Sequence, residues 1–356
     1  MALSKIQSNS YEDTAVHGQR NLIINGAMQV AQRGTSSTSS GYGSVDRFSV
    51  EYGGGTITHS QETLTSGTPY EKGFRKFLRA TATSAGSDAA ADFCYLVQYV
   101  EAQNVADSGW NYTSSNSYLT IQFWVRSSLA GTYYCVFKSI DGTARAFITP
   151  VVLAANTWTK ITQSISGDSN LQFDNNTGAG LEISIRPYVG TNYTDPSVNT
   201  TTWYTRSGTT QTPDYLQNWQ STGSATFDIT GVQLEVGEQA TPFEHRSYGD
   251  ELARCQRYCT VLNSPSGQFM YRDYYSNDTM VTDAEMPVTM RTTPSITMTG
   301  SGGTSSTGFT YINLAATPTL AAVNPQAISV FRGVASAART YIYLASTGEL
   351  TMEAEL

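Results

Sequence analysis

Charged side chains are scarce in this sequence. Asp, Glu, Lys and Arg together make up 14% of the 356 residues, whereas they make up about 25% of an average soluble domain. Acidic residues outnumber basic ones by 29 to 21, and the basic residues do not cluster. Because nucleic-acid binding depends on basic side chains that neutralise a row of phosphates, we expect no nucleic acid among the partners.

Long apolar runs and cysteines are also rare. No run of about 18 apolar residues occurs, and no apolar segment follows the first residues, so we expect neither membrane insertion nor export by the general secretion route. The four cysteines, Cys94, Cys135, Cys255 and Cys259, are too few for a disulfide scaffold in a chain of this length. A metal site at Cys255 and Cys259 would need two further ligands, and we expect none there.

Catalytic motifs are missing as well. The chain has no nucleophile elbow, HExxH zinc helix, Walker loop or CxxC pair. Four acidic residues, Asp228, Glu235, Glu238 and Glu244, lie close together in sequence, and a glycosidase needs two carboxyl groups at a set separation. With 29 acidic residues in the chain, such proximity arises by chance. We therefore expect a protein without catalytic activity and without a cofactor.

Thr, Ser, Asn, Gly and 22 Tyr stand in place of the missing charges, a mixture that favours strands and turns. The sequence predicts ten strands, at 46–52, 56–62, 76–83, 93–101, 118–126, 132–139, 145–153, 158–165, 181–189 and 225–235. In the run 118–126, Leu119, Ile121, Phe123 and Val125 alternate with polar residues or Trp, which predicts a core face and a wetter face. The pattern predicts an all-β fold, a jelly-roll sandwich over 21–244.

One helix is predicted after the sandwich, over 250–262, with Ser247 and Asp250 as possible caps. Its apolar residues follow a 3-4-3 spacing and are Leu252, Cys255, Cys259 and Leu262. Two interpretations of this stripe stay open. It packs on the end of the sandwich, or it forms a short contact seam on the axis of an oligomer.

The predicted domain order follows from these patterns. Residues 1–20 are polar and form an extended arm, 21–244 form the jelly roll, 245–263 form the linking helix, and 264–356 form a smaller β domain. Alternation continues up to Leu356, which predicts a packed final strand.

Aromatic residues outside the regular strands are candidates for carbohydrate binding, because a flat ring stacks on the apolar face of a sugar while polar neighbours bind its hydroxyls. The candidates are Trp110, Tyr112, Trp203, Tyr204 and Trp219. The last three lie in a stretch without clean periodicity, 191–224, which is typical of a long functional loop. The alternative for each ring is a place in the core or in an interface.

Segments at both ends of the predicted sandwich resemble a known group of proteins. The opening segment reads NLIINGAMQVAQRG over 21–34, followed by VDRF at 45–48. The closing segment reads FDITGVQLEVG over 227–237, followed by ATPFEHR at 240–246. Together with ELARCQRY at 251–258 and MRTTP at 290–294, these segments resemble bacteriophage tail-fibre and minor virion structural proteins built on a jelly roll like that of carbohydrate-binding modules.

The resemblance implies a virion location and a homotrimer that attaches to other virion proteins, with the N-terminal arm as the expected attachment. It does not decide between tail fibres and capsid-attached fibres. Our leading hypothesis is a tail fibre or receptor-binding protein whose ligand is a host surface glycan. A capsid decoration or head-fibre protein is the first alternative, and a polysaccharide depolymerase is the second. Modules of this kind often hold calcium between an acidic residue after the opening strand and an Asp on the final strand. Here Gln29 stands at the first position and Asp228 matches the second, so Asp228 is the remaining calcium candidate and we expect no metal.

Overall fold

The computed structural model describes residues 20–263, 287–299 and 349–356 and the short strands at 274–276, 279–284, 309–311, 319–322, 331–336 and 342–344. The chain divides into two compact units, of which the first ends at Arg246 and the second runs from Ser247 to Glu355. The predicted arm lies outside the described residues except for Arg20. None of the helices within the described ranges has the length and apolar character needed to cross a membrane.

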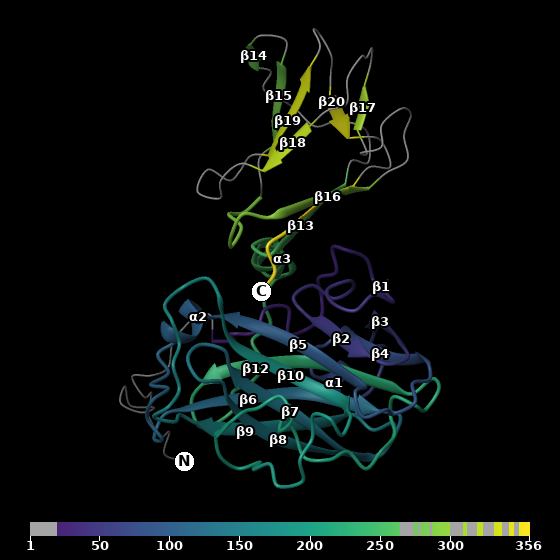
Figure 1. Ribbon diagram of the computed structural model, residues 1–356, viewed down its shortest axis with the longest axis vertical. Coiled ribbons are helices and arrows are strands. Elements are labelled where there is room, and N and C mark those ends of the chain that lie inside the picture. Colours follow the sequence, from purple (N-terminus) through teal and green to yellow (C-terminus); the bar gives the residue numbers. More distant parts are fainter. Residues whose placement is uncertain are drawn as a thin grey trace, which may run out of the picture. The chain divides into compact units, whose positions relative to one another are not determined.

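The first unit is a sandwich of two antiparallel six-stranded sheets (Figure 1). Sheet A has the order β1-β3-β4-β12-β6-β9, with bounds Ser36–Ser37, Thr56–Thr63, Lys76–Ser84, Thr226–Val236, Tyr118–Ser127 and Thr159–Ser166. Sheet B has the order β11-β8-β7-β10-β5-β2, with bounds Tyr204–Thr205, Arg145–Leu153, Gly131–Ser139, Ala179–Val189, Phe93–Glu101 and Ser49–Gly53. Two short helices, α1 (Thr68–Glu71) and α2 (Ala102–Ala106), lie between strands. The all-β prediction is confirmed.

Alternation along the strands builds the core between the two sheets. On β6, Leu119, Ile121, Phe123 and Val125 are at most 1% exposed, and burial of one such side chain contributes about 1.5–3 kcal/mol. On the outer face of β6, Trp124 and Arg126 are partly exposed, whereas Thr120 is buried. Gln122 is also buried, because residues after β12 fold back over it and Gln122 Nε2 donates to the backbone oxygen of Thr241 at 2.6 Å.

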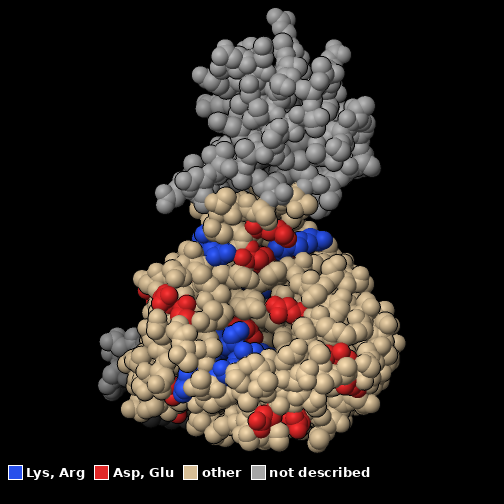
Figure 2. All heavy atoms as spheres, viewed as in Figure 1, with Lys and Arg blue, Asp and Glu red and all other residues tan. Residues whose placement is uncertain are grey.

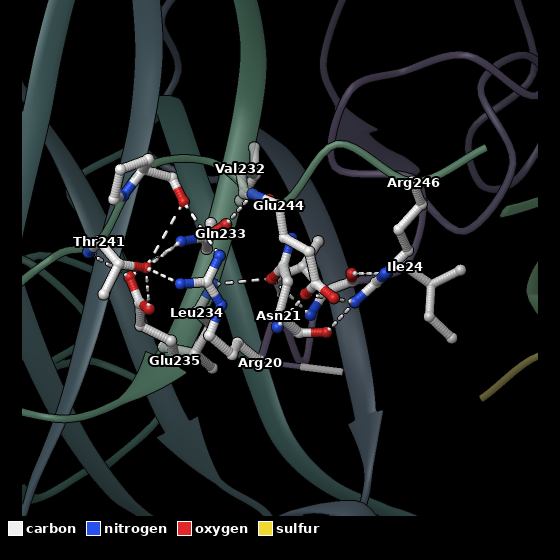
Figure 3. A network of polar contacts seen from close by, with 12 residues as sticks. Arg20, Asn21, Ile24, Val232, Gln233, Leu234, Glu235, Thr241, Glu244 and Arg246 are labelled. Atoms are coloured by element: carbon white, nitrogen blue, oxygen red, sulfur yellow. Dashed lines mark hydrogen bonds and ion pairs between the residues drawn. The ribbon is translucent and has the colours of Figure 1, made fainter. Parts of the chain in front are cut away.

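The opening and closing segments of the sandwich lie against each other (Figure 3). Asn21 Oδ1 accepts from the backbone N–H of Leu234 at 2.9 Å, and Asn21 Nδ2 donates to the Val232 oxygen at 3.1 Å. The backbone N–H of Asn21 donates to Glu244 Oε2 at 2.8 Å, and Arg246 donates to the Asn21 oxygen at 2.5 Å. We call these five residues the terminal clasp. The two segments that carry the resemblance thus form one structural feature.

Gly26 lets the opening segment approach the closing strand closely. A Cβ atom at this position would lie 2.0 Å from the backbone oxygen of Val232, a separation that no side chain tolerates. The backbone N–H of Val232 donates to the Gly26 oxygen at 2.9 Å. Glycine is therefore required where the two segments meet.

The predicted functional loop at 191–224 covers the outer face of sheet B. Tyr134, Val136, Ala146 and Ile148 on this face are buried, with Val198, Tyr204 and Tyr215 packed on the same cluster. Polar contacts also join the loop to the sheet, because Arg186 donates to Gln211 Oε1 at 3.0 Å and Tyr215 donates to the Arg186 backbone oxygen at 3.0 Å. The long stretch without periodicity is a packed cover.

The second unit begins with α3, Tyr248–Gln256. Ser247 is its N-cap, and the Ser247 hydroxyl accepts from the backbone N–H of Asp250 at 3.2 Å, so Asp250 belongs to the first turn. The predicted end at residue 262 is wrong, since a strand, β13 (Cys259–Asn263), follows the helix almost at once. Tyr, Cys, Thr and Val at 258–261 favour a strand, and β21 supplies a partner for it.

The helical stripe of Leu252, Cys255, Cys259 and Leu262 is therefore wrong as a single helix face. Leu252 and Cys255 lie on α3, whereas Cys259 and Leu262 lie on β13. Cys255 and Cys259 are fully buried and Leu252 is partly buried, while the side chain of Leu262 lies outside the described residues. A role of these residues in a subunit contact stays a prediction.

The remaining strands of the second unit form three small sheets. The final strand β21 (Glu349–Glu353) pairs with β13 and with β16 (Ser295–Thr299), which confirms the predicted strand at the end of the chain. The other described strands are β14 (Tyr274–Ser276), β15 (Thr279–Ala284), β17 (Phe309–Tyr311), β18 (Thr319–Ala322), β19 (Phe331–Ser336) and β20 (Ile342–Leu344). They form a sheet of order β14-β15-β19-β18 and the pair β17-β20.

Candidate functional site

The three tryptophans predicted to bind sugar are buried. Trp110 is 2% exposed, Trp203 is 7% exposed and Trp219 is not exposed. Each indole N–H donates to a backbone oxygen, namely that of Ser117, Ser166 or Thr226. The expectation of exposed rings is wrong for these residues, because each indole anchors an irregular segment to the sandwich.

The two tyrosine candidates are partly buried. Tyr112 packs edge-to-face on Phe173, with 5.0 Å between ring centres, and Phe173 also packs on Trp110. The Tyr204 hydroxyl donates to the backbone oxygen of Thr210 at 3.0 Å. Trp110 and Tyr112 pack together with Phe173, whereas Trp219 packs on Phe227 in the main core. Because the three tryptophans are buried, the five candidates do not form one exposed platform.

A different set of side chains forms a row across the outer face of sheet A. Strand pairing places Ser60 beside Arg79, Arg79 beside Asp228, and Asp228 beside Arg126. Trp158 directly precedes β9 and continues the row, since the next residue of β9 pairs with the residue before Arg126. We call these five residues the arginine row. They point outward because their strand neighbours, such as Leu78 and Phe227, are buried in the core.

Asp228 lies between the two guanidinium groups of the row. Arg79 donates through Nε to Oδ1 at 2.8 Å and through Nη2 to Oδ2 at 3.0 Å. Arg126 donates through Nε and Nη2 to Oδ2 at 2.9 and 2.7 Å. The Asp228 side chain is not exposed, whereas the arginine side chains are 29% and 27% exposed. Hydrogen bonding to Asp228 raises the pKa of the Arg79 guanidinium further.

These contacts overturn Asp228 as a calcium candidate. Both of its oxygens accept hydrogen bonds from arginine, and two guanidinium groups repel a divalent cation. Within the described part of the chain, no group of three or more His, Cys, Asp or Glu residues could hold a metal ion.

Aromatic rings hold the guanidinium groups in place. The central carbon of the Arg126 guanidinium lies 4.7 Å from the ring centre of Trp158, and that of Arg79 lies 5.2 Å from the ring centre of Phe77. Phe77 meets Trp158 edge-to-face at 5.6 Å. Trp158 and the neighbouring Trp124 are both partly exposed. Cation–π contacts of this kind restrict the arginine rotamers and leave part of the indole surface open.

Hydroxyl groups extend the face along one side of the arginine row. Thr81 pairs with both Thr58 and Thr226 on the neighbouring strands. All three threonines are partly exposed, and the exposed Thr83 donates to Thr58. The outer face of sheet A therefore brings together guanidinium donors, hydroxyl groups and indole rings. These are the groups that bind sugar hydroxyls and stack on sugar rings.

A local signal for the arginine row exists in the sequence. Arg79 and Arg126 occupy outward positions in predicted strands of a chain that has few charges, and Asp228 lies in the closing segment. The pairing that brings the three together joins residues more than 100 positions apart. Periodicity within one strand carries no information about such pairing.

The fold has distant similarity to a phage tailspike domain and to carbohydrate-binding modules. The enzymatically active domain of tailspike protein 4 from bacteriophage CBA120 aligns at 11% identity and a TM-score of 0.35, over 61% of this chain and 22% of that chain. The family 11 carbohydrate-binding module from Clostridium thermocellum, in complex with a β-1,3-1,4-mixed-linked tetrasaccharide, aligns at 12% identity and a TM-score of 0.29. The alignment covers 59% of this chain and 98% of that chain. The N-terminal cellulose-binding domain of Cellulomonas fimi β-1,4-glucanase C aligns at 9% identity and a TM-score of 0.29, over 60% of this chain and 99% of that chain.

These similarities concern the β-sandwich alone. The chain spans only about a fifth of the tailspike chain that it matches. The TM-scores of the three matches all lie below 0.5. No protein-family model and no curated protein sequence matches the chain.

Proposed function

We propose that this chain is a structural subunit of a bacteriophage fibre that binds a host surface glycan through the outer face of sheet A. The observation that carries the glycan-binding part is the arginine row with its partly exposed Trp158 and the adjoining threonines. The virion part is supported by the opening and closing segments that resemble phage tail-fibre proteins, which meet in the terminal clasp.

Binding at one such face is expected to be weak. The face offers two partly exposed indole rings, those of Trp158 and Trp124, and a few hydrogen-bonding groups. It lies on the surface of a sheet, where water competes with sugar hydroxyls. Several copies on one particle would raise the overall affinity without any new contact, because the second binding event becomes intramolecular. A fibre with several identical subunits supplies these copies.

The test is binding of the full-length protein to host envelope polysaccharides on an array. We expect Trp158→Ala to lower the affinity about tenfold, which corresponds to about 1.4 kcal/mol. Leu216→Ala is the matched control, since Leu216 is 96% exposed and lies in the cover of sheet B. Folded wild-type protein that binds neither host envelope nor any glycan would contradict the proposal.

We also propose that the chain has no hydrolytic activity. Three of the four carboxylates near the closing strand are engaged in structural contacts: Asp228 pairs with two arginines, Glu235 accepts from Thr241, and Glu244 accepts from the Asn21 backbone. Release of reducing sugar from a bound polysaccharide would contradict this and favour the depolymerase alternative.

The particle location and the homotrimer are proposals that rest on the resemblance. Immunogold labelling of virions would distinguish a tail fibre from a capsid decoration or head-fibre protein. Light scattering should give three times the chain mass of 38.6 kDa, and a monomer at micromolar concentration would contradict the trimer.

A further inference from the structure

We infer that the arginine row selects acidic polysaccharides, and that Arg126 and Arg79 bind the carboxylate of a uronic acid unit. This inference rests on the proposed glycan binding and names the ligand class. It begins with the edges of the two guanidinium groups that Asp228 leaves open.

Each arginine contacts Asp228 through the same edge. Arg79 and Arg126 both use Nε and Nη2, which leaves the opposite edge, formed by Nη1 and Nη2, in each group. Among the described residues, no hydrogen bond is formed by the Nη1 atoms of these two side chains. Because the side chains are 29% and 27% exposed, the open edges are accessible to a ligand.

The charges around the row leave a positive surplus. Near the row, three basic residues, Arg79, Arg126 and Lys160, lie on the outer face of sheet A with two acidic residues, Asp228 and Glu62. A third acidic residue on this face, Glu235, lies beyond the bulge of β12, where it is buried and accepts from Thr241. The negative charge of Glu62 helps to raise the pKa of the Arg79 guanidinium, after the larger effect of Asp228. Glu62 also accepts a hydrogen bond from the Ser60 hydroxyl at 2.7 Å. Arg126 lies on the far side of Asp228 from Glu62 and next to Trp158. The positive surplus is therefore centred on Arg126.

This surplus stands out against the rest of the molecule. The chain has a net charge of −8, and most of the surface of the first unit in the view of Figure 2 belongs to uncharged residues. A positive site on a negative, charge-poor protein attracts an anion locally without attracting polyanions over the whole surface. Selection by the site is therefore expected to exceed non-specific attraction.

The geometry favours a carboxylate on a sugar. A guanidinium edge presents two parallel N–H donors that match the two oxygens of a carboxylate. Trp158 beside Arg126 provides an apolar surface for the sugar ring, and the partly exposed threonines provide hydroxyl partners on the other side. Pairing of Arg126 with Asp228 and its contact with Trp158 fix the guanidinium before the ligand arrives, which lowers the entropic cost of binding.

The test compares four polymers that bind to the immobilised full-length protein: polygalacturonate, its methyl ester, dextran sulfate and neutral dextran. The methyl ester keeps the sugar ring and removes the charge. We expect polygalacturonate to bind at least about tenfold more tightly than the methyl ester, which corresponds to about 1.4 kcal/mol. We also expect this preference to shrink between about 50 and 500 mM salt as screening increases.

Substitutions in the arginine row test whether its residues cause the preference for polygalacturonate over the methyl ester. Arg126→Gln should lower polygalacturonate binding about tenfold and leave binding of the methyl ester unchanged, whereas Trp158→Ala should weaken both. Arg126→Lys keeps the charge and loses the two-donor edge, so it should also weaken polygalacturonate binding. If Arg126→Gln does not fold, Arg126→Lys and Arg79→Gln provide the test, because each changes a guanidinium group that is proposed to bind the carboxylate.

The outcomes separate this inference from the proposed function. Equal binding of polygalacturonate and its methyl ester would overturn the acidic selection and keep glycan binding. Preference for dextran sulfate over polygalacturonate would overturn the carboxylate assignment, as would unchanged binding by Arg126→Lys. Absence of binding to all four polymers and to host envelope would contradict the proposed function itself.

Discussion

Asp228 shares its two carboxylate oxygens between guanidinium groups on two neighbouring strands. Asp228→Asn removes the negative charge and leaves two positive groups side by side. Because both arginines are partly exposed, water compensates some of the loss, and we expect the free energy of unfolding to fall by about 1–3 kcal/mol. Urea denaturation at neutral pH measures this change.

Asp168 provides the matched control for Asp228. It pairs with Arg145 at 3.4 Å, and its side chain is 26% exposed. Asp168→Asn is expected to cost less than about 1 kcal/mol, as for other solvent-exposed ion pairs. Equal losses for the two variants would show that Asp228 has no special role in the sheet.

Trp219 and Trp158 should separate folding from binding. Trp219 is fully buried and its indole donates to the Thr226 backbone oxygen at 3.2 Å, so Trp219→Ala should lower the free energy of unfolding by about 3–5 kcal/mol. Trp158 is partly exposed, and Trp158→Ala should cost less stability while it weakens glycan binding. Thermal melting of both variants beside a binding assay tests the pair; a small loss for Trp219→Ala would contradict the core assignment.

His59 should make stability depend on pH. Its Nε2 lies 2.9 Å from the Ser39 backbone oxygen and its Nδ1 lies 2.7 Å from the Ser44 hydroxyl, so Nε2 carries the proton and Nδ1 accepts. Burial lowers the pKa of His59 below its usual value. The unfolded chain then binds a proton at a higher pH, about 6.5, than the folded chain.

The free energy of unfolding should therefore fall as the pH drops below about 6.5, until the folded protein also takes up the proton. His59→Asn should remove this part of the pH dependence. Urea denaturation at several pH values and an NMR titration of the His59 ring provide the measurements. A His59 ring that titrates above its usual pKa in the folded protein would contradict the prediction.

At the scale of elements, strands are the part that sequence patterns predict well. The predicted strands 93–101 and 145–153 coincide with β5 and β8, and the other eight predicted strands of the sandwich differ from the observed ones by a few residues. Strict alternation and flanking turn residues act locally, so a local pattern suffices to find them. The short β1 and β11 have no such pattern and were not predicted.

Elements that depend on distant partners were predicted less well. The helix ends at Gln256 because the following residues pair with β21, almost 100 positions later. The arginine row has the same origin, since it exists only through the register of β4, β12 and β6. Burial of the three tryptophans likewise depends on where their segments pack, and the sequence shows only that these segments are irregular.

The terminal clasp should contribute strongly to the stability of the sandwich. Asn21 is 5% exposed, and its side chain joins the opening segment to Val232 and Leu234 of β12. Asn21→Ala leaves buried backbone groups without partners, and we expect a loss of about 2–3 kcal/mol. The exposed Asn170 is the control, because Asn170→Ala should change the free energy of unfolding by less than about 0.5 kcal/mol. Chemical denaturation that shows equal losses would contradict this role.

At the scale of the whole molecule, the first unit should fold without the second. Its main core cluster consists only of residues between Ile23 and Leu234, and its clasp is complete at Arg246. A fragment of residues 20–246 should therefore unfold in one cooperative transition and retain the glycan binding of the full chain. Calorimetry and the polymer assay test this expectation, and a fragment without a cooperative transition would contradict it.

The clasp should also determine how the sandwich responds to mechanical force. Asn21 lies near the start of the described part of the sandwich and Arg246 lies at its end, and contacts among Asn21, Glu244 and Arg246 hold these two points together. In a fibre of the proposed kind, tension applied at these two points would pass through these few contacts, and the strands of the sandwich would carry little load while the clasp is closed. The proposed binding face on sheet A would then keep its shape under tension for as long as the clasp stays closed.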